Sequence, residues 1–285
     1  MRTVYLNDQY LPEAEAQVSI FDRGFLFADS VYEVISVLDG KLVDFDAHVV
    51  RLHRSMAELK MDQALDREML LNLCRELVAR NALAEGVIYV QVTRGNPGDR
   101  DFLFPPAGTP PTIAAFTQSM ALIDRSHAKT GLSIVTLPDR RWGMATVKTT
   151  QLLYASLMKA EAKAQGADDA WLVRDGFVTE GTSQNAHIVT REGVLVTHPL
   201  DSNILHGITQ ASVIELARQG VCRAEARAFS AEEAKQASEA LVTAASAFVL
   251  PVTRIDGVQL GDGKAGPIML KLREIYIEFA RRSAI

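Results

Sequence analysis

Lys148 and Glu180 have side chains and sequence surroundings suited to covalent chemistry on amino groups. Lys148 lies in the segment ATVKTT ahead of an expected helix, and Glu180 begins the loop EGTSQN after an expected strand. A lysine amine forms a Schiff base with an aldehyde such as that of pyridoxal phosphate (PLP), and a carboxylate keeps a pyridine nitrogen protonated. If the two residues converge, the chain is predicted to bind PLP. Each residue taken singly has a simpler interpretation. Lys148 could be an ordinary surface lysine, and the loop at Glu180 could be a hairpin loop whose Ser and Thr side chains form hydrogen bonds with their own backbone.

A phosphate site is expected at the start of a later helix. Gly207, Ile208 and Thr209 open that helix, where exposed backbone N–H groups and a hydroxyl can bind an anion. Arg51 lies on another expected helix and could give the phosphate a charge-assisted hydrogen bond. An ordinary N-cap at Thr209 and a surface arginine at Arg51 are the alternative interpretations.

The composition excludes several classes of protein. The net charge of −5 offers no basic surface, so nucleic acid is not expected as a partner. No apolar run has the length of a membrane span, and the six histidines lack metal-binding spacing. The two cysteines, Cys74 and Cys222, are expected as buried free thiols in helix-like segments. We therefore expect a cytoplasmic, metal-free protein without a membrane anchor.

The first half of the chain is expected to combine strand pairs with two helices. Hairpins are predicted at residues 3–12 and 30–45, with turns at Asn7-Asp8 and Asp39-Gly40. Asp46 is predicted as the N-cap of one helix, and a second helix is predicted from Asp66 to Arg80. Strand candidates follow at residues 86–95 and 112–120.

The second half is expected to begin with a helix over residues 149–167, in which Leu152, Leu153 and Leu157 form one apolar stripe. Hairpin turns are predicted at Asp175-Gly176 and Glu192-Gly193. A helix is predicted to end at Gly220, and Ser230 and Glu233 are predicted to form the capping box of the next helix. Two strands joined by a turn near residue 245 and a last helix from Pro267 to Arg282 complete the prediction. Strands and helices are mixed without strict alternation, which favours an α+β fold. We expect a small N-terminal domain over residues 1–117, a linker over residues 118–123 and a larger C-terminal domain over residues 124–285.

Six segments occur in an order typical of one enzyme family: FDRGFLFADSVYEV, HVVRL, QVTRG, the Lys148 segment, VTEGTSQN and ILHGIT. Together they resemble the fold-type IV PLP-dependent aminotransferases, and among these they look most like the D-amino acid aminotransferases. The resemblance spans nearly the whole chain. It implies an α+β homodimer in which PLP lies between a small N-terminal domain and a larger C-terminal domain with a β-barrel-like core. The implied reaction transfers the amino group of a D-amino acid such as D-alanine to a 2-oxo acid such as 2-oxoglutarate.

The resemblance also implies roles for individual residues. Lys148 matches the lysine that forms the Schiff base with PLP, and Glu180 matches the partner of the pyridine nitrogen. The other matches are Arg51, Ile208 and Thr209 for the phosphate, Arg141 and Ser183 for further cofactor contacts, Tyr32 for the active-site tyrosine, and Arg100 for the substrate carboxylate across the dimer interface.

Two departures from the family pattern concern the substrate and the phosphate. Phe102 stands two residues after Arg100, where D-amino acid enzymes commonly have a histidine, so the substrate and its stereochemistry stay open. Ala244 and Ala245 stand where the family often has hydroxyl residues, and Thr243, Ser246 or backbone N–H groups could replace them.

Other activities remain open on the same fold. They are an (R)-selective amine transaminase, a branched-chain L-amino acid aminotransferase and an aminodeoxychorismate lyase. A non-catalytic PLP-binding dimer is the alternative from a different class of protein.

Overall fold

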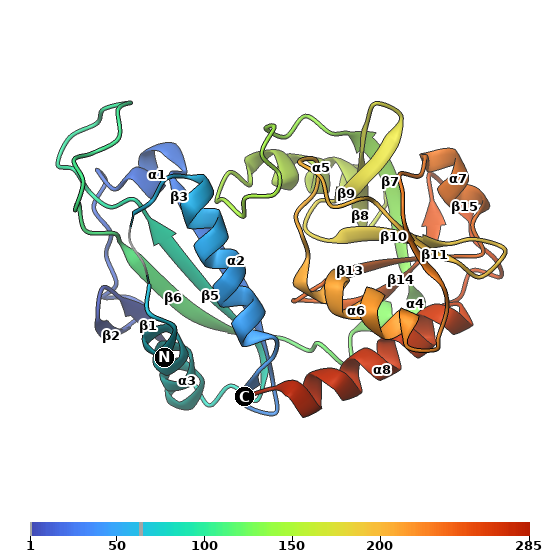
Figure 1. The fold of residues 1–285 in the computed structure, drawn as a ribbon, viewed down its shortest axis with the longest axis horizontal. Helices are drawn as coiled ribbons and strands as arrows, with labels where there is room; N and C mark the ends of the chain where they lie inside the picture. The colour runs from blue at the N-terminus through green and yellow to red at the C-terminus, as the bar shows by residue number, and fades with distance from the viewer. Residues whose placement is uncertain (1, 63–64) are drawn as a thin grey trace. The chain divides into compact units, whose positions relative to one another are not determined.

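The computed structural model describes residues 2–62 and 65–285 of the chain (Figure 1). These residues form two compact units, and each unit is described by itself. The first unit contains the described residues up to Ala121, together with Val147–Gln151 and Ala280–Ile285. The second unit contains Leu122–Thr146 and Leu152–Phe279. The segment with Lys148 therefore lies in the first unit, although we expected residues 124–285 to form one C-terminal domain.

The first unit is built on a six-stranded antiparallel sheet with the strand order β2-β1-β6-β5-β3-β4. Its strands are β1 (Thr3–Leu6), β2 (Gln9–Pro12), β3 (Ser30–Leu38), β4 (Lys41–Leu42), β5 (Glu85–Thr93) and β6 (Ile113–Ser119). The turns at Asn7-Asp8 and Asp39-Gly40 are confirmed, because all four residues have positive φ angles. Two such residues in succession match the twist of a tight hairpin, and Asn, Asp and Gly tolerate that conformation best.

Helices α2 (Phe45–Glu58) and α3 (Arg67–Arg80) pack against this sheet, and the short helix α1 (Arg23–Phe27) precedes β3 (Figure 1). The prediction that Asp46 is the N-cap of α2 is wrong. The N-cap is Asp44 (φ 53°), and Asp46 lies in the first turn, where it pairs with Arg67 at 2.6 Å. Phe45, which directly precedes Asp46, is 2% exposed. Because the burial of Phe45 is favourable, the helix begins at this residue and not after Asp46. The second helix begins as expected, because the Asp66 carboxylate accepts the Met69 N–H at 2.8 Å.

The second unit is built on a nine-stranded mixed sheet that curls into a half barrel. Eight strands follow the order β12-β11-β10-β13-β14-β7-β8-β9, and β15 pairs with β14. The strands are β7 (Leu132–Pro138), β8 (Asp169–Arg174), β9 (Phe177–Gly181), β10 (Asn185–Val189), β11 (Leu195–Thr197), β12 (Ala224–Ala226), β13 (Glu239–Ala244), β14 (Phe248–Ile255) and β15 (Val258–Gln259). Inward-facing side chains, among them Trp171, Ile188, Phe229 and Leu250, form its core. The two sheets with their helices confirm the predicted α+β fold.

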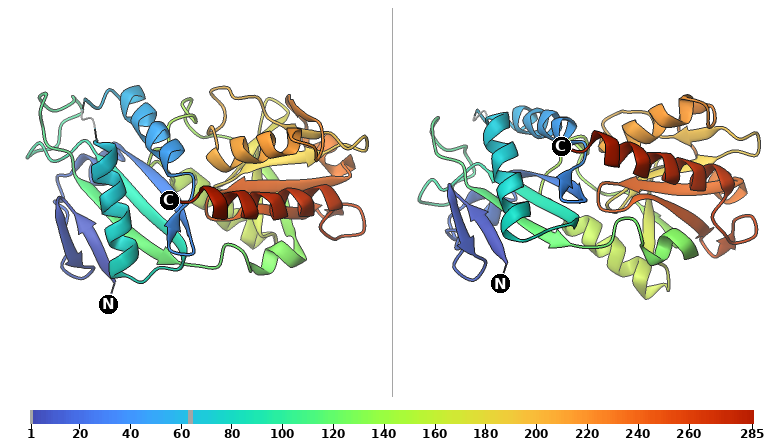
Figure 2. Two further views of the ribbon diagram at one scale, coloured as in Figure 1. Left: turned by 60° about the horizontal axis from the view of Figure 1, so that its bottom comes forward. Right: turned by 90° about the horizontal axis from the view of Figure 1, so that it is seen from below.

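The helices of the second unit are α4 (Ser126–Thr130), α5 (Leu153–Ala164), α6 (Ile208–Arg218), α7 (Ala231–Gln236) and α8 (Pro267–Ser283), the last of which ends in the first unit. Figure 2 shows α6 and α8 running along the nine-stranded sheet. Ser230 caps α7 as predicted, because its hydroxyl accepts the Glu233 N–H at 3.1 Å. Helix α5 is shorter than predicted, and Leu152, Leu153 and Leu157 are 40%, 74% and 54% exposed rather than packed in the core of this unit.

Cys74 is buried in α3 as expected, whereas Cys222 is only half-buried in the turn that follows α6. Burial raises the pKa of the Cys74 thiol to about 12, so this thiol is unreactive at neutral pH. Among residues 2–62 and 65–285, no helix is both long and apolar enough to cross a membrane.

Candidate active site

Lys148 lies in an irregular segment that is attached to strand β3 of the first unit. Thr149 forms an isolated bridge with Val31, and the Tyr32 N–H donates to the Lys148 carbonyl at 3.0 Å. The Lys148 Nζ is 4.4 Å from the centroid of the Tyr32 ring, a cation–π distance. Within the described residues of this unit, the Lys148 ammonium has no carboxylate partner. The two predicted residues Lys148 and Tyr32 therefore lie side by side.

Tyr32 is itself fixed by aromatic packing. Its ring stacks on Tyr89 with a centroid distance of 5.2 Å, and Tyr89 stacks on Phe116 at 4.9 Å. These residues are on the neighbouring strands β3, β5 and β6, so the register of the sheet sets the position of the Tyr32 ring.

Arg51 is held by a buried carboxylate. Its Nε and Nη2 donate to the two oxygens of Glu33 at 2.8 and 2.7 Å, and His48 Nδ1 meets the same carboxylate at 2.7 Å. Glu33 is 1% exposed and follows Tyr32 on β3. Ser55, one helical turn after Arg51, accepts the backbone N–H of Lys148 at 3.3 Å. These contacts connect Arg51, Tyr32 and Lys148 within one unit.

The charge states of this group follow from its burial and its partners. Burial acts to raise the pKa of Glu33, but the charge and hydrogen bonds of Arg51, together with those of His48, outweigh it and lower the pKa to about 2. Burial lowers the pKa of His48. Glu33 is therefore an ionised acceptor, so a neutral His48 must have its proton on Nδ1 and donate it to Glu33.

Arg100 lies in an exposed loop between β5 and β6. Its guanidinium carbon is 5.1 Å from the Phe27 ring centroid and 4.8 Å from that of Phe102. Buried Arg23 holds the loop, because its Nη1 donates to the carbonyls of Asp101 and Leu103 at 2.6 and 3.1 Å. Arg100 is thus an accessible cation with aromatic neighbours on a loop that is anchored by its backbone.

Glu180 lies near the end of β9 in the second unit and is 5% exposed. One carboxylate oxygen, Oε1, pairs with Arg141. The other oxygen, Oε2, accepts from the Asn185 side-chain amide at 3.0 Å and from the Leu205 N–H at 3.2 Å. Three donors from separate segments therefore hold the carboxylate in one orientation and stabilise its ionised form.

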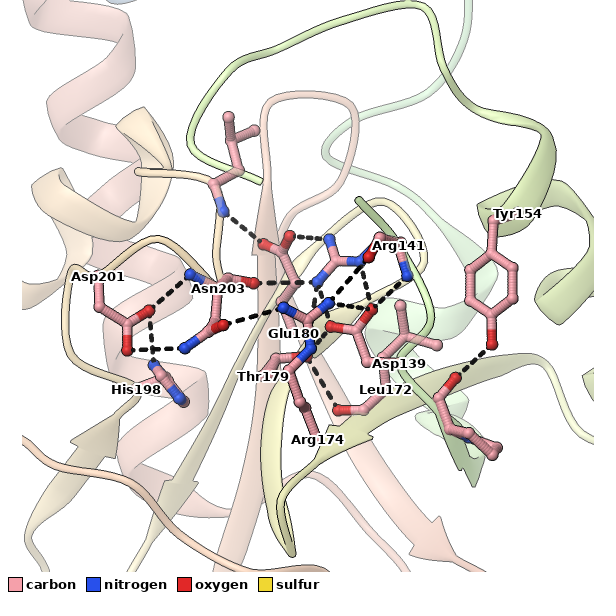
Figure 3. Close-up of polar contacts among 12 residues, drawn as sticks. Asp139, Arg141, Tyr154, Leu172, Arg174, Thr179, Glu180, His198, Asp201 and Asn203 are labelled. Atoms are coloured by element: carbon pink, nitrogen blue, oxygen red, sulfur yellow. Dashed lines mark hydrogen bonds and ion pairs between the residues drawn. The ribbon is translucent and has the colours of Figure 1, made fainter. Parts of the chain in front are cut away.

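Arg141 connects Glu180 to a second buried carboxylate, Asp139 (Figure 3). The Nε and Nη2 of Arg141 donate to the two oxygens of Asp139 at 3.0 and 2.8 Å. The Thr179 hydroxyl also donates to Asp139 at 2.8 Å, and Arg174 Nη2 lies 3.2 Å from it. Burial acts to raise the pKa of Asp139, but the hydrogen bonds and charge of Arg141 outweigh it and lower the pKa to about 2.

The start of helix α6 lies beside Glu180. The same Asn185 side chain that donates to Glu180 also donates to the Leu205 carbonyl at 2.9 Å, and Gly207 is the N-cap of the helix. Gln210 fixes the first turn, because its amide donates to the Thr197 hydroxyl at 2.8 Å. Ile208 and Thr209 are the first two helical residues, so their backbone N–H groups lack acceptors within the helix. The structure therefore brings Glu180, Arg141, Ile208 and Thr209 together.

Thr243 and Ser246, the candidates to replace the hydroxyl groups missing at Ala244 and Ala245, differ in burial. Thr243 is 1% exposed, and its hydroxyl is engaged with His187 Nε2 at 2.9 Å. Ala244, the last residue of β13, and Ala245 and Ser246, in the turn between β13 and β14, are all half-buried. Ser183 is exposed in the bend between β9 and β10, and its role as a cofactor contact stays a prediction.

The two clusters have the groups that PLP requires. The first unit supplies a lysine amine and an arginine, and the second supplies a fixed, ionised carboxylate and the amino end of a helix. A side chain at Gly207 would fill this corner of the second unit, because its Cβ would overlap Asn185 Oδ1. An amine for the aldehyde, an acceptor for the ring N–H and donors for the phosphate are all present.

Sequence reasoning did not single out two residues that hold the site, Glu33 and Asp139. Each of them fixes a residue that we had expected to contact the cofactor. A charged residue at an inward-facing position of β3 was a usable signal for Glu33. Asp139, in the charged run DRR, looks like a solvated residue in the sequence alone.

Comparison with known proteins agrees with the geometry. A family model described as amino-transferase class IV matches residues 30–255. The D-alanine aminotransferase of Bacillus licheniformis is 37% identical over 266 residues, which are 93% of this chain and 92% of that protein. The D-alanine aminotransferase of Staphylococcus aureus (strain N315) is 36% identical over 287 residues and covers 100% of both chains.

A solved structure has the same fold. The crystal structure of a branched-chain aminotransferase from the thermophilic archaeon Thermoproteus uzoniensis, with norvaline, superposes with a TM-score of 0.85 at 26% identity. The match covers 98% of this chain and 94% of that one.

Proposed function

The chain belongs to the class IV aminotransferases, and we propose that its Lys148 cluster and its Glu180 cluster serve the same PLP molecule. The chain is a PLP-dependent transaminase for D-amino acids, with a 2-oxo acid as the amino acceptor. The observation that supports D-alanine as the donor is the full-length match to proteins named D-alanine aminotransferase. The matched structure named branched-chain aminotransferase is less similar in sequence.

Lys148 has two tasks in this proposal. Its amine would hold PLP covalently. When it is not bonded to the cofactor, the same amine would move the proton at the substrate Cα. Bound PLP supplies an electron sink for the negative charge that develops at Cα. The Tyr32 ring, whose centroid is 4.4 Å from Nζ, holds the Lys148 amine through a cation–π contact.

Glu180 keeps the ring nitrogen of PLP protonated. Its carboxylate is ionised because Arg141, Asn185 and the Leu205 N–H all donate to it. The phosphate is bound by Arg51 and by the N–H groups of Ile208 and Thr209. These roles rest on the residue types, on the contacts within each unit and on the family.

Arg100 and Tyr32 are proposed to bind the substrate carboxylate. Arg100 is exposed and has a planar guanidinium suited to a carboxylate, and Tyr32 adjoins Lys148. The family resemblance implies that Arg100 acts on the site of a second subunit. Leu153 and Leu157 lie one turn apart on α5 and are 74% and 54% exposed, and this apolar helix face supports a homodimer because such faces are usually covered.

Phe102 favours one second candidate, an (R)-amine transaminase. Its ring packs on Phe27 at 5.5 Å and against Arg100, so an aromatic surface stands where D-amino acid enzymes commonly have a histidine.

Both cysteines are free thiols, which is consistent with the reducing cytoplasm that we expected.

One assay separates these functions. Purified protein loaded with PLP receives D-alanine and 2-oxoglutarate, and pyruvate and D-glutamate are measured. Parallel reactions contain L-leucine or an aromatic (R)-amine in place of D-alanine. We expect pyruvate and D-glutamate in equal amounts. Turnover of L-leucine or of the (R)-amine with no reaction of D-alanine would reject the proposed donor.

A further inference from the structure

Asp139 is a fully buried carboxylate that does not bind Glu180 directly but binds its partner. The Asp139 side chain is 0% exposed and takes two hydrogen bonds from the Arg141 side chain (Figure 3). Two further donors, the Thr179 hydroxyl and Arg174, meet the same carboxylate. The Arg141 backbone N–H donates to Asp139 as well, so a buried negative charge is held directly against the arginine that pairs with Glu180.

The formal charges of the network cancel. Asp139 and Glu180 are negative, and Arg141 and Arg174 are positive, with contacts that run Arg174–Asp139–Arg141–Glu180. All four side chains are at most 22% exposed, so solvent screens their interactions only in part. A proton on the PLP ring nitrogen adds one positive charge beside Glu180. Arg141 opposes that charge, and Asp139 offsets Arg141.

Two further titratable groups, Asp201 and His198, adjoin the network through Asn203. Asp201 accepts from Asn203, whose side-chain oxygen accepts from Arg174 at 3.0 Å and whose carbonyl accepts from Arg141 at 3.1 Å. His198 Nδ1 lies 3.9 Å from Asp201. Among the described residues, Arg141 is therefore in direct contact with two anionic groups, Glu180 and Asp139.

We propose that Asp139 is a positioning residue that sets the proton affinity of the PLP ring nitrogen through Arg141. This inference rests on the proposed role of Glu180. With Asp139 ionised, Arg141 shares its charge between two carboxylates, and Glu180 retains the negative charge that a protonated nitrogen needs. Without the Asp139 charge, Arg141 is left uncompensated beside Glu180 and disfavours that proton.

The test measures the ring nitrogen itself and needs no turnover. Wild-type and variant proteins are loaded with PLP that has ¹⁵N in the ring, and the ¹⁵N NMR shift is followed against pH. In Asp139→Asn, the pH at which the nitrogen is half protonated should fall by about one pH unit, a tenfold loss of proton affinity. In Asp139→Asn/Arg141→Gln, both charges are removed, so this pH should return toward the wild-type value.

One single variant serves as a control and another as an independent test. Thr179→Val removes a neutral donor to Asp139 but no charge, so it should lower thermal stability and leave the titration of the nitrogen unchanged. Arg174→Gln removes a positive charge from the network and should shift the titration to higher pH, the opposite direction from Asp139→Asn. Arg174 is partly exposed, so this variant tests the proposal even if Asp139→Asn does not fold.

The outcomes separate this inference from the proposed function. Wild-type protein that holds no PLP would overturn both. Wild-type protein that holds PLP on Lys148, with an unchanged nitrogen titration in Asp139→Asn, would overturn the inference alone. A double variant shifted further than Asp139→Asn would also overturn it, because a purely structural role predicts added damage where the charge argument predicts recovery. A shift of Arg174→Gln to lower pH would contradict the inference in the same way.

Discussion

Asn185 donates one side-chain N–H to Glu180 and the other to the Leu205 carbonyl, at 3.0 and 2.9 Å. This amide joins the carboxylate expected at the ring nitrogen to the segment that leads into α6, where the phosphate is expected. The Leu205 N–H also donates to Glu180, so Glu180 and the segment before α6 are held together both by the Asn185 side chain and by a direct backbone contact.

Gly207→Ala should disturb this arrangement. The new Cβ would overlap Asn185 Oδ1, so Asn185 must move and loosen its hold on Glu180. We expect weaker PLP binding, by about tenfold or more, measured by fluorescence titration of the apo protein, since about 1.4 kcal/mol corresponds to tenfold. Gly143→Ala is the matched control, because no atom lies within 4 Å of its Cβ. Equal PLP affinity in the two variants would contradict the proposed role of Asn185.

Glu180→Gln should lower kcat with little change in the fold. The glutamine keeps the shape of the side chain but loses the charge that holds the ring nitrogen protonated. Hydrogen bonds to charged groups are worth about 1.5–3 kcal/mol, so kcat should fall by roughly ten- to a hundredfold. Stopped-flow measurement of the half-reaction with D-alanine tests this, with the exposed Glu215→Gln on α6 as the control. An unaltered half-reaction would remove Glu180 from the site.

Features that depend on neighbouring residues could be predicted from the sequence. The turns at Asn7-Asp8 and Asp175-Gly176 and the cap at Ser230 were correct, because backbone preference and side-chain hydrogen bonding act within a few residues. The cap at Asp46 was wrong, because the burial of Phe45 against the rest of the unit decides where α2 begins.

The surroundings of the site residues depend on distant contacts and could not be predicted. Lys148 joins the first unit through the bridge between Val31 and Thr149, which no local pattern indicates. The pairing of Asp139 with Arg141 is local in the sequence. The contact of Arg141 with Glu180 forms only because the sheet brings the end of β7 and the strand β9 together through β8. The residue types that could do chemistry were visible in the sequence, whereas the residues that hold them were not.

Arg100→Ala should raise KM for D-alanine more than it lowers kcat. Loss of a charge-assisted bond to the substrate carboxylate costs about 1.5–3 kcal/mol, which corresponds to roughly ten- to a hundredfold in KM. Steady-state kinetics measure the effect, and the exposed Arg191→Ala provides the control. An unchanged KM would exclude Arg100 from carboxylate binding. PLP affinity should stay at the wild-type value, because Arg100 has no proposed contact with the cofactor.

Acid should destabilise the protein between about pH 5 and pH 2. The pKa of Glu33 is lowered to about 2 from 4.5. A carboxyl with a lowered folded-state pKa stabilises the fold above the unfolded pKa, and this contribution is lost as the pH falls through the folded value. The difference corresponds to about 3 kcal/mol. Urea unfolding at a series of pH values measures this loss.

Glu33→Gln isolates that contribution. Arg51 is left without its buried carboxylate, so the variant should be less stable at pH 7 by about 3–5 kcal/mol. It should also lose less stability than the wild type on acidification. Equal acid dependence in the two proteins would show that Glu33 does not titrate as proposed. Glu76→Gln, in an exposed pair with Arg80, should change neither quantity appreciably.

The most direct measurement is the identity of the lysine that binds PLP. Protein loaded with PLP is reduced with borohydride, digested and mapped by mass spectrometry, beside Lys148→Arg, which keeps the cation near Tyr32 but should not support turnover. We predict a pyridoxyl group on Lys148 in the wild-type protein and no transamination of D-alanine by the variant. A pyridoxyl group on another lysine, or wild-type turnover by Lys148→Arg, would contradict the account.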